Sequence, residues 1–109
     1  MEIKNFELGD FIIGIPIDIG PRILKFTLKK YPKKNVFGIL PDFLIETEEG
    51  KWHIYGGHRV WTSPEAKPRS YSLDNKRVKI EAGREYIKIY GNPEIQNSLL
   101  KEIEIRNKY

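Results

Sequence analysis

Hydrophobic and polar residues alternate along much of this chain with a period of two. From Phe11 to Ile19 every odd position is Phe or Ile, and small or polar residues fill most even positions. Successive side chains of a strand point to opposite faces, so this pattern predicts a strand with one buried face. Because Pro16 lacks an N–H group, we expect this strand to lie at a sheet edge or to break there.

The same alternation predicts further strands, separated by turns. Gly20-Pro21 predicts a turn, after which residues 22–28 place Leu24, Phe26 and Leu28 on one side. Residues 37–46 are apolar and interrupted, and residues 48–51 predict a hairpin turn. The clearest hairpin joins residues 77–82 to 85–90 through a turn at 83–84.

The C-terminal segment fits two patterns. Asn92-Pro93-Glu94 is typical of a helix start, and Ile95, Leu99 and Ile103 fit a helical stripe. Residues 101–106 alternate cleanly, however, and we expect a strand from about Leu99. Many short strands with frequent turns predict an all-β fold, an antiparallel β-sandwich formed by residues 1–109 as a single domain.

Composition narrows the class of protein. The chain has 109 residues, 39% of them hydrophobic and 31% charged, with no cysteine and no apolar run long enough to cross a membrane. With no signal-peptide pattern, a cytoplasmic protein is expected. Abundant Lys, Glu and Ile also suit a thermophile. The formal charge of +4 is mild, so we interpret the basic run Lys25–Lys34 as a loop that blunts a sheet edge rather than a polyanion site.

The segment Trp52–Asn75 holds both histidines and both tryptophans, beside basic residues, two acids and Gly56-Gly57. A core strand has no use for aromatic rings next to so many hydrogen-bonding groups. The mixture is typical of a wall that binds a polar ligand with a flat apolar face, such as a sugar. We therefore expect Arg59 and Trp61 to line a cleft.

Other chemistry in this segment is less well supported. A bend at Gly56-Gly57 could bring His53 and His58 together, but two histidines do not complete a metal site, so no metal is expected. Glu65 and Asp74 could form an acid pair, or either could pair with Arg59 to pin the loop. We expect no cofactor and no catalytic residue.

Two other functions remain open. Thirteen aromatic residues among 19 basic ones could stack and bind single-stranded nucleic acid on a small β-barrel. These aromatic residues do not recur on one face of adjacent predicted strands, so nucleic acid is the weaker hypothesis. The other alternative is a structural or assembly module.

Three segments together resemble the first part of galactose-mutarotase-like proteins, of the aldose-1-epimerase superfamily. They are Ile17–Leu24 with Asn35-Val36-Phe37, then Tyr55–Glu65 with Tyr71–Asn75, and Leu99–Arg106, and Gly-Gly-His-Arg-x-Trp is the most specific motif. The resemblance implies a partial β-supersandwich that binds sugars in a groove. By position, His58 and Arg59 match the early His and Arg that hold the sugar in that family, and Arg22 is a further candidate.

The resemblance also has consequences for activity and assembly. The family's chains are much longer, and their acid and base come from later strands, so sugar binding without catalysis is expected. We expect a homo-oligomer, or a second chain that completes the sandwich, because core residues such as Ile103 and Ile105 would otherwise face water. The ligand-binding residues predicted in all are Arg22, His58, Arg59, Trp61, Glu65, Tyr71 and Asp74.

Overall fold

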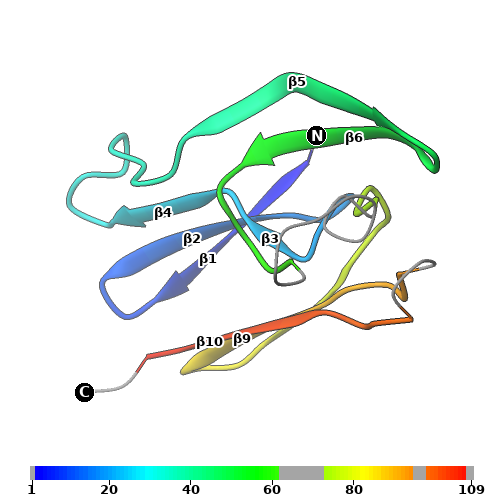
Figure 1. Cartoon of the computed structure of the whole chain (residues 1–109). Coiled ribbons are helices and arrows are strands. Elements are labelled where there is room, and N and C mark those ends of the chain that lie inside the picture. Colours follow the sequence, from blue (N-terminus) through cyan, green and yellow to red (C-terminus); the bar gives the residue numbers. More distant parts are fainter. Residues whose placement is uncertain (1, 62–72, 95–97, 108–109) are drawn as a thin grey trace.

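The structure is a computed structural model that describes residues 2–61, 73–94 and 98–107 (Figure 1). Over these residues every regular element is a strand, which confirms the all-β prediction. No helix that could cross a membrane occurs in these ranges. The strands are β1 (Ile3–Leu8), β2 (Phe11–Pro16), β3 (Arg22–Ile23), β4 (Lys25–Leu28), β5 (Ile39–Thr47), β6 (Gly50–Gly56), β7 (His58–Arg59), β8 (Lys79–Ala82), β9 (Tyr86–Tyr90) and β10 (Glu102–Arg106).

Two three-stranded antiparallel sheets enclose the core. One has the order β1-β2-β4 and the other the order β10-β9-β8, and Figure 1 shows them as separate layers. Both sheets present apolar side chains to the space between them, where the hydrophobic effect favours their burial. The core residues are Leu8, Ile13, Ile15, Ile23, Val78, Ile87, Ile89 and Ile103. This arrangement is compatible with the predicted sandwich.

In strand β2 the alternation of hydrophobic and polar residues predicted the buried face but not the place of the strand in the sheet. Ile13 and Ile15 are buried as predicted, and the strand ends at Pro16. An edge position was wrong, because β2 lies between β1 and β4. Pro16 is tolerated there because it is the last residue of the strand, where the ladder with β4 has already ended at Gly14.

Residues 22–28 form two short strands instead of one. At Leu24 the backbone N–H donates to the Gly14 carbonyl, 2.9 Å away, between β3 and β4. At the end of β4, Leu28 is exposed, whereas Thr27 on the opposite face is buried. The alternation of hydrophobic and polar residues does not reveal that a polar side chain, Thr27, is buried in this segment.

The C-terminal half forms the second sheet. β8 and β9 pair through the predicted turn, with Ile80 opposite Ile89, and β10 adds to the other edge of β9 with Ile103 opposite Ile89. The strand predicted near the C-terminus is therefore confirmed. A second chain was expected to cover Ile103, but this sheet packs on β1-β2-β4 of the same chain and buries it there.

β5 and β6 form a separate two-stranded ribbon (Figure 1). Its turn, Glu48-Glu49, lies where the sequence predicted it, and the Thr47 hydroxyl donates to the Gly50 carbonyl at 2.7 Å. Gly50 has a φ of 130°, which favours glycine. The register shifts between Leu40 and Leu44, so β5 carries a bulge.

The packing of the two sheets predicts unequal costs of truncation. Ile89 is fully buried, so Ile89→Ala should lower the free energy of unfolding by about 2–5 kcal/mol. Val36 is 69% exposed, and Val36→Ala should change it by less than about 0.5 kcal/mol. Urea unfolding followed by circular dichroism measures both. Similar losses for the two variants would contradict the packing described.

Candidate functional site

The corner between β6 and β7 depends on two glycines. Gly56 and Gly57 have φ values of 93° and 74°. A Cβ atom at Gly56 would lie 2.2 Å from the Gly38 carbonyl oxygen, and one at Gly57 would lie 2.1 Å from that of Ile23. Only glycine permits both the backbone conformation and these close approaches. The corner lets β7 pair with β3, which sets the position of the predicted site residues.

The β3–β7 pair places two arginines directly opposite each other, Arg22 and Arg59. Opposite residues of an antiparallel pair are close neighbours, and like charges there are unfavourable. The positive charges of the two guanidinium groups are stabilised in different ways. Arg22 meets a carboxylate and backbone carbonyls, whereas Arg59 lies between two indole rings.

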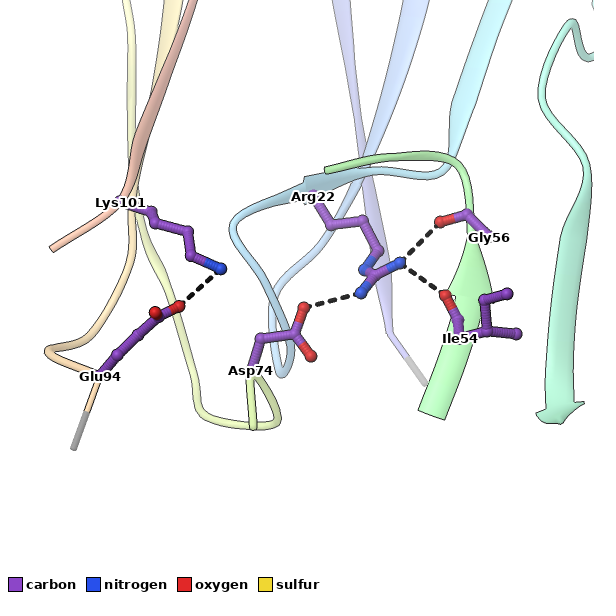
Figure 2. Close-up of polar contacts among 6 residues, drawn as sticks. All are labelled: Arg22, Ile54, Gly56, Asp74, Glu94 and Lys101. Atoms are coloured by element: carbon purple, nitrogen blue, oxygen red, sulfur yellow. Dashed lines mark hydrogen bonds and ion pairs between the residues drawn. The ribbon is translucent and has the colours of Figure 1, made fainter. Parts of the chain in front are cut away.

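Arg22 is the most buried charged group of the site, with 1% of its side chain exposed (Figure 2). Its Nη1 donates to the carbonyls of Ile54 and Gly56 at 2.7 and 2.8 Å, and its Nη2 donates to Asp74 Oδ2 at 2.7 Å. These bonds join β3, the end of β6 and the segment after residue 72. A buried charge is tolerated only when it is paired and hydrogen-bonded in this way.

Tyr55 lies beside this ion pair. Its ring is 5.2 Å from the Arg22 guanidinium carbon, and its φ of 52° turns the backbone just before the corner. Burial raises the pKa of the Tyr55 phenol above its ordinary value, and the Asp74 carboxylate adds to this while Arg22 opposes it. The phenol therefore stays neutral at physiological pH and can donate a hydrogen bond.

A cleft opens at the stacked side chains. The Arg59 guanidinium lies 4.9 Å from the ring centre of Trp52 and 4.4 Å from that of Trp61. Trp52 is buried, whereas Trp61 is 43% exposed. The cleft has a volume of about 350 Å³ and is lined by Arg22, Trp52, Ile54, Gly56, Gly57, His58, Arg59 and Trp61. Arg59 and Trp61 thus line a cleft, as the sequence predicted.

A smaller pocket of about 100 Å³ lies on the other side of Asp74. Lys101 Nζ and Glu94 Oε2 form an ion pair there at 2.5 Å, with 11% and 5% of the side chains exposed (Figure 2). Sequence reasoning missed this pair. No local pattern links Glu94, in a loop, to Lys101, just before β10. The backbone N–H of Glu94 donates to the Leu99 carbonyl at 2.8 Å, which closes the loop and aligns the two side chains.

The residues predicted to bind a ligand lie in different places in the structure. His58 and Arg59 lie together on β7, with Trp61 two residues farther on. Arg22 and Asp74 form the buried ion pair, so Asp74 is engaged by Arg22 rather than by Arg59. A direct contact of Arg22 with a ligand stays a prediction, and its bonds to protein atoms make it a residue that positions the cleft. Glu65 and Tyr71 lie outside the described residues.

The two histidines have separate aromatic neighbours. The His53 ring stacks on Tyr55 at 5.1 Å, and the His58 ring lies 6.5 Å from that of Phe37. Within the described ranges no three His, Asp or Glu residues come together in a way that could hold a metal ion. The Gly56-Gly57 pair forms the backbone corner that allows β7 to pair with β3.

Comparisons with models of protein families, with curated proteins and with solved structures find no match to this chain. The resemblance to galactose-mutarotase-like proteins accordingly stays a prediction.

The buried ion pair predicts a large effect of one substitution. Asp74→Ala leaves the Arg22 charge buried without its carboxylate and should lower the free energy of unfolding by about 3–5 kcal/mol. A matched control is Glu104→Ala, which removes the exposed pair with Arg106 and should cost less than about 1 kcal/mol. Denaturant unfolding at neutral pH compares them. An Asp74→Ala variant as stable as the control would show that Arg22 does not need this partner.

Proposed function

We propose that this chain binds carbohydrate in the cleft formed by β7 and Trp61. The observation that carries the proposal is the Trp61 indole, 43% exposed at the cleft and stacked on the Arg59 guanidinium. An exposed indole offers a flat apolar surface to the C–H face of a sugar ring. Because its contact with the Arg59 guanidinium already orients Trp61, less entropy is lost when a ligand packs on it.

The rest of the cleft supplies polar groups. His58 is exposed at the rim, and its imidazole can both donate to and accept from sugar hydroxyls. The inner wall is held in place by Arg22. A volume of about 350 Å³ falls at the lower end of the range for small-ligand sites and suits one sugar unit. The resemblance to mutarotase-like proteins supports the same class of ligand.

Single-stranded nucleic acid is less well supported. The aromatic residues that are most exposed among the described ones, Tyr31, Phe43 and Trp61, come from three separate segments. Stacking of successive bases needs aromatic rings spaced along one groove. The cleft offers one such ring, so a single sugar unit is the better fit.

Sugar binding can be tested through tryptophan fluorescence. Titration with a panel of mono- and disaccharides should give a saturable change for at least one sugar, and Trp61→Ala should abolish it while buried Trp52 still reports folding. Tyr31→Ala, which removes an exposed ring outside the cleft, is the matched control and should bind normally. Affinity should hardly change between low and high salt, whereas binding through phosphate contacts falls steeply with salt.

Two outcomes would count against this function. One is a flat titration for the whole panel. The other is tight binding of oligonucleotides that weakens steeply with salt and requires Trp61, which would favour the nucleic-acid alternative.

We propose binding without catalysis. Anomerisation needs an acid and a base on opposite sides of the sugar ring, and the described residues that line the cleft include one histidine and no carboxylate. Polarimetry of freshly dissolved sugars should show no acceleration above the buffer rate. An acceleration that His58→Ala removes would contradict this expectation.

A further inference from the structure

Strand β5 and the residues just before it expose several large apolar side chains. None of these side chains takes part in the proposed sugar binding. These residues, called here the β5 apolar row, are Val36 (69% exposed), Ile39 (42%), Leu40 (56%), Phe43 (52%) and Leu44 (41%). Single exposed apolar residues are ordinary on a protein surface, but so many within nine positions are unusual, and since neighbouring residues of a strand point to opposite faces they leave apolar side chains on both faces of β5.

The backbone of this ribbon also has edges that are not hydrogen-bonded to another described strand. β5 pairs with β6, and neither joins either three-stranded sheet within the described part of the chain. A two-stranded ribbon is marginally stable in water by itself. Its outer edges carry N–H and C=O groups that can bind another chain, although Asp42, Glu46 and the bulge limit how much of the β5 edge is open to strand pairing.

Charge along the ribbon indicates the partner. The loop before β5 carries exposed lysines, among them Lys33 and Lys34, and the turn after it carries Glu48 and Glu49. Figure 1 shows this loop and this turn at opposite ends of the ribbon. One end of the surface is therefore basic, the centre is apolar apart from the exposed Asp42, and the other end is acidic.

This pattern is complementary to itself when two copies lie antiparallel. A two-fold axis near the middle of β5 brings the basic loop of each copy beside the acidic turn of the other, with the two apolar rows in contact between them. A parallel arrangement would bring like charges together. A partner of one charge sign, such as a polyanion or an anionic membrane, would match one end and be repelled by the other.

We propose that the β5 apolar row and its two charged ends form the interface of a symmetric homodimer. The interface is separate from the cleft at Trp61, so the proposal does not depend on sugar binding. It also differs from the assembly expected to cover Ile103 and Ile105, since the core of this chain already covers Ile103.

Charge reversal in two different variants tests this geometry. Variant one carries Glu48→Lys and Glu49→Lys, and variant two carries Lys33→Glu and Lys34→Glu. In a homodimer of either variant, like charges meet at both ends, so we expect the dimer dissociation constant to rise by about tenfold or more. In a one-to-one mixture every end again joins opposite charges, and a heterodimer should form.

Sedimentation velocity at micromolar concentrations measures the outcome. The wild type should sediment as a dimer, each variant alone mainly as a monomer, and the mixture as a dimer. Glu2→Lys with Glu85→Lys gives the same net charge as variant one with the ribbon unchanged, and it should stay dimeric. Phe43→Asp should give a monomer, and circular dichroism should show each variant folded.

Three results would overturn the proposal. The first is a wild type that stays monomeric across the concentration range. The second is a wild-type dimer that neither charge reversal nor Phe43→Asp weakens. The third is a mixture of the two charge variants that fails to associate, which would exclude the antiparallel arrangement.

Discussion

The buried guanidinium of Arg22 is the interaction on which the cleft depends. With 1% of its side chain exposed, it must be paired, and it finds its partners in three segments far apart in the sequence. The carbonyls of Ile54 and Gly56 fix the end of β6, and Asp74 fixes the chain after residue 72. Since β6 leads through Gly57 into β7, the position of His58 and Arg59 follows from the same contacts.

The two arginines of the β3–β7 pair illustrate how one constraint produces a site. Arg22 and Arg59 face each other across the ladder, where two positive charges would repel. Asp74 neutralises the first, and the indole faces of Trp52 and Trp61 stabilise the second. The arrangement around Arg59 leaves the Trp61 ring at the surface beside a cleft. We infer that this ring is what a sugar would contact.

Sequence patterns predicted the local structure well where one strand face is buried. The alternation of β2 and the β8–β9 hairpin were predicted correctly because Ile13, Ile15, Ile87 and Ile89 face one core. Alternation failed where the chain meets more than one neighbour. Leu24 interrupts a strand by bonding to Gly14, and Leu28 is exposed although Phe26, on the same side of the segment, packs against the core. Of the two alternatives for Pro16, the break holds and the edge position does not, since strand order is a property of the whole fold.

The site was predictable in part. The density of aromatic and basic residues from Trp52 onward indicated the cleft, and Arg59 and Trp61 do line it. The partner of Asp74 was not predictable, because Arg22 is remote in sequence and Arg59 was the nearer choice. The Lys101–Glu94 pair gave no signal either, since a loop brings these residues together. The cover of Ile103 was expected from another chain, because local patterns do not show which sheet packs on which, and it comes from the first sheet of the same chain.

The most direct test of the account is a two-dimensional NMR spectrum of the two tryptophan indole N–H groups during titration with a sugar that binds. The account predicts that the Trp61 indole signal shifts saturably, because its ring is exposed at the cleft, and that the signal of buried Trp52 shifts less. Neither signal moving while the sugar binds would contradict it. Shifts confined to the amides around Lys101 and Glu94 would place binding in the smaller pocket and refute the central claim.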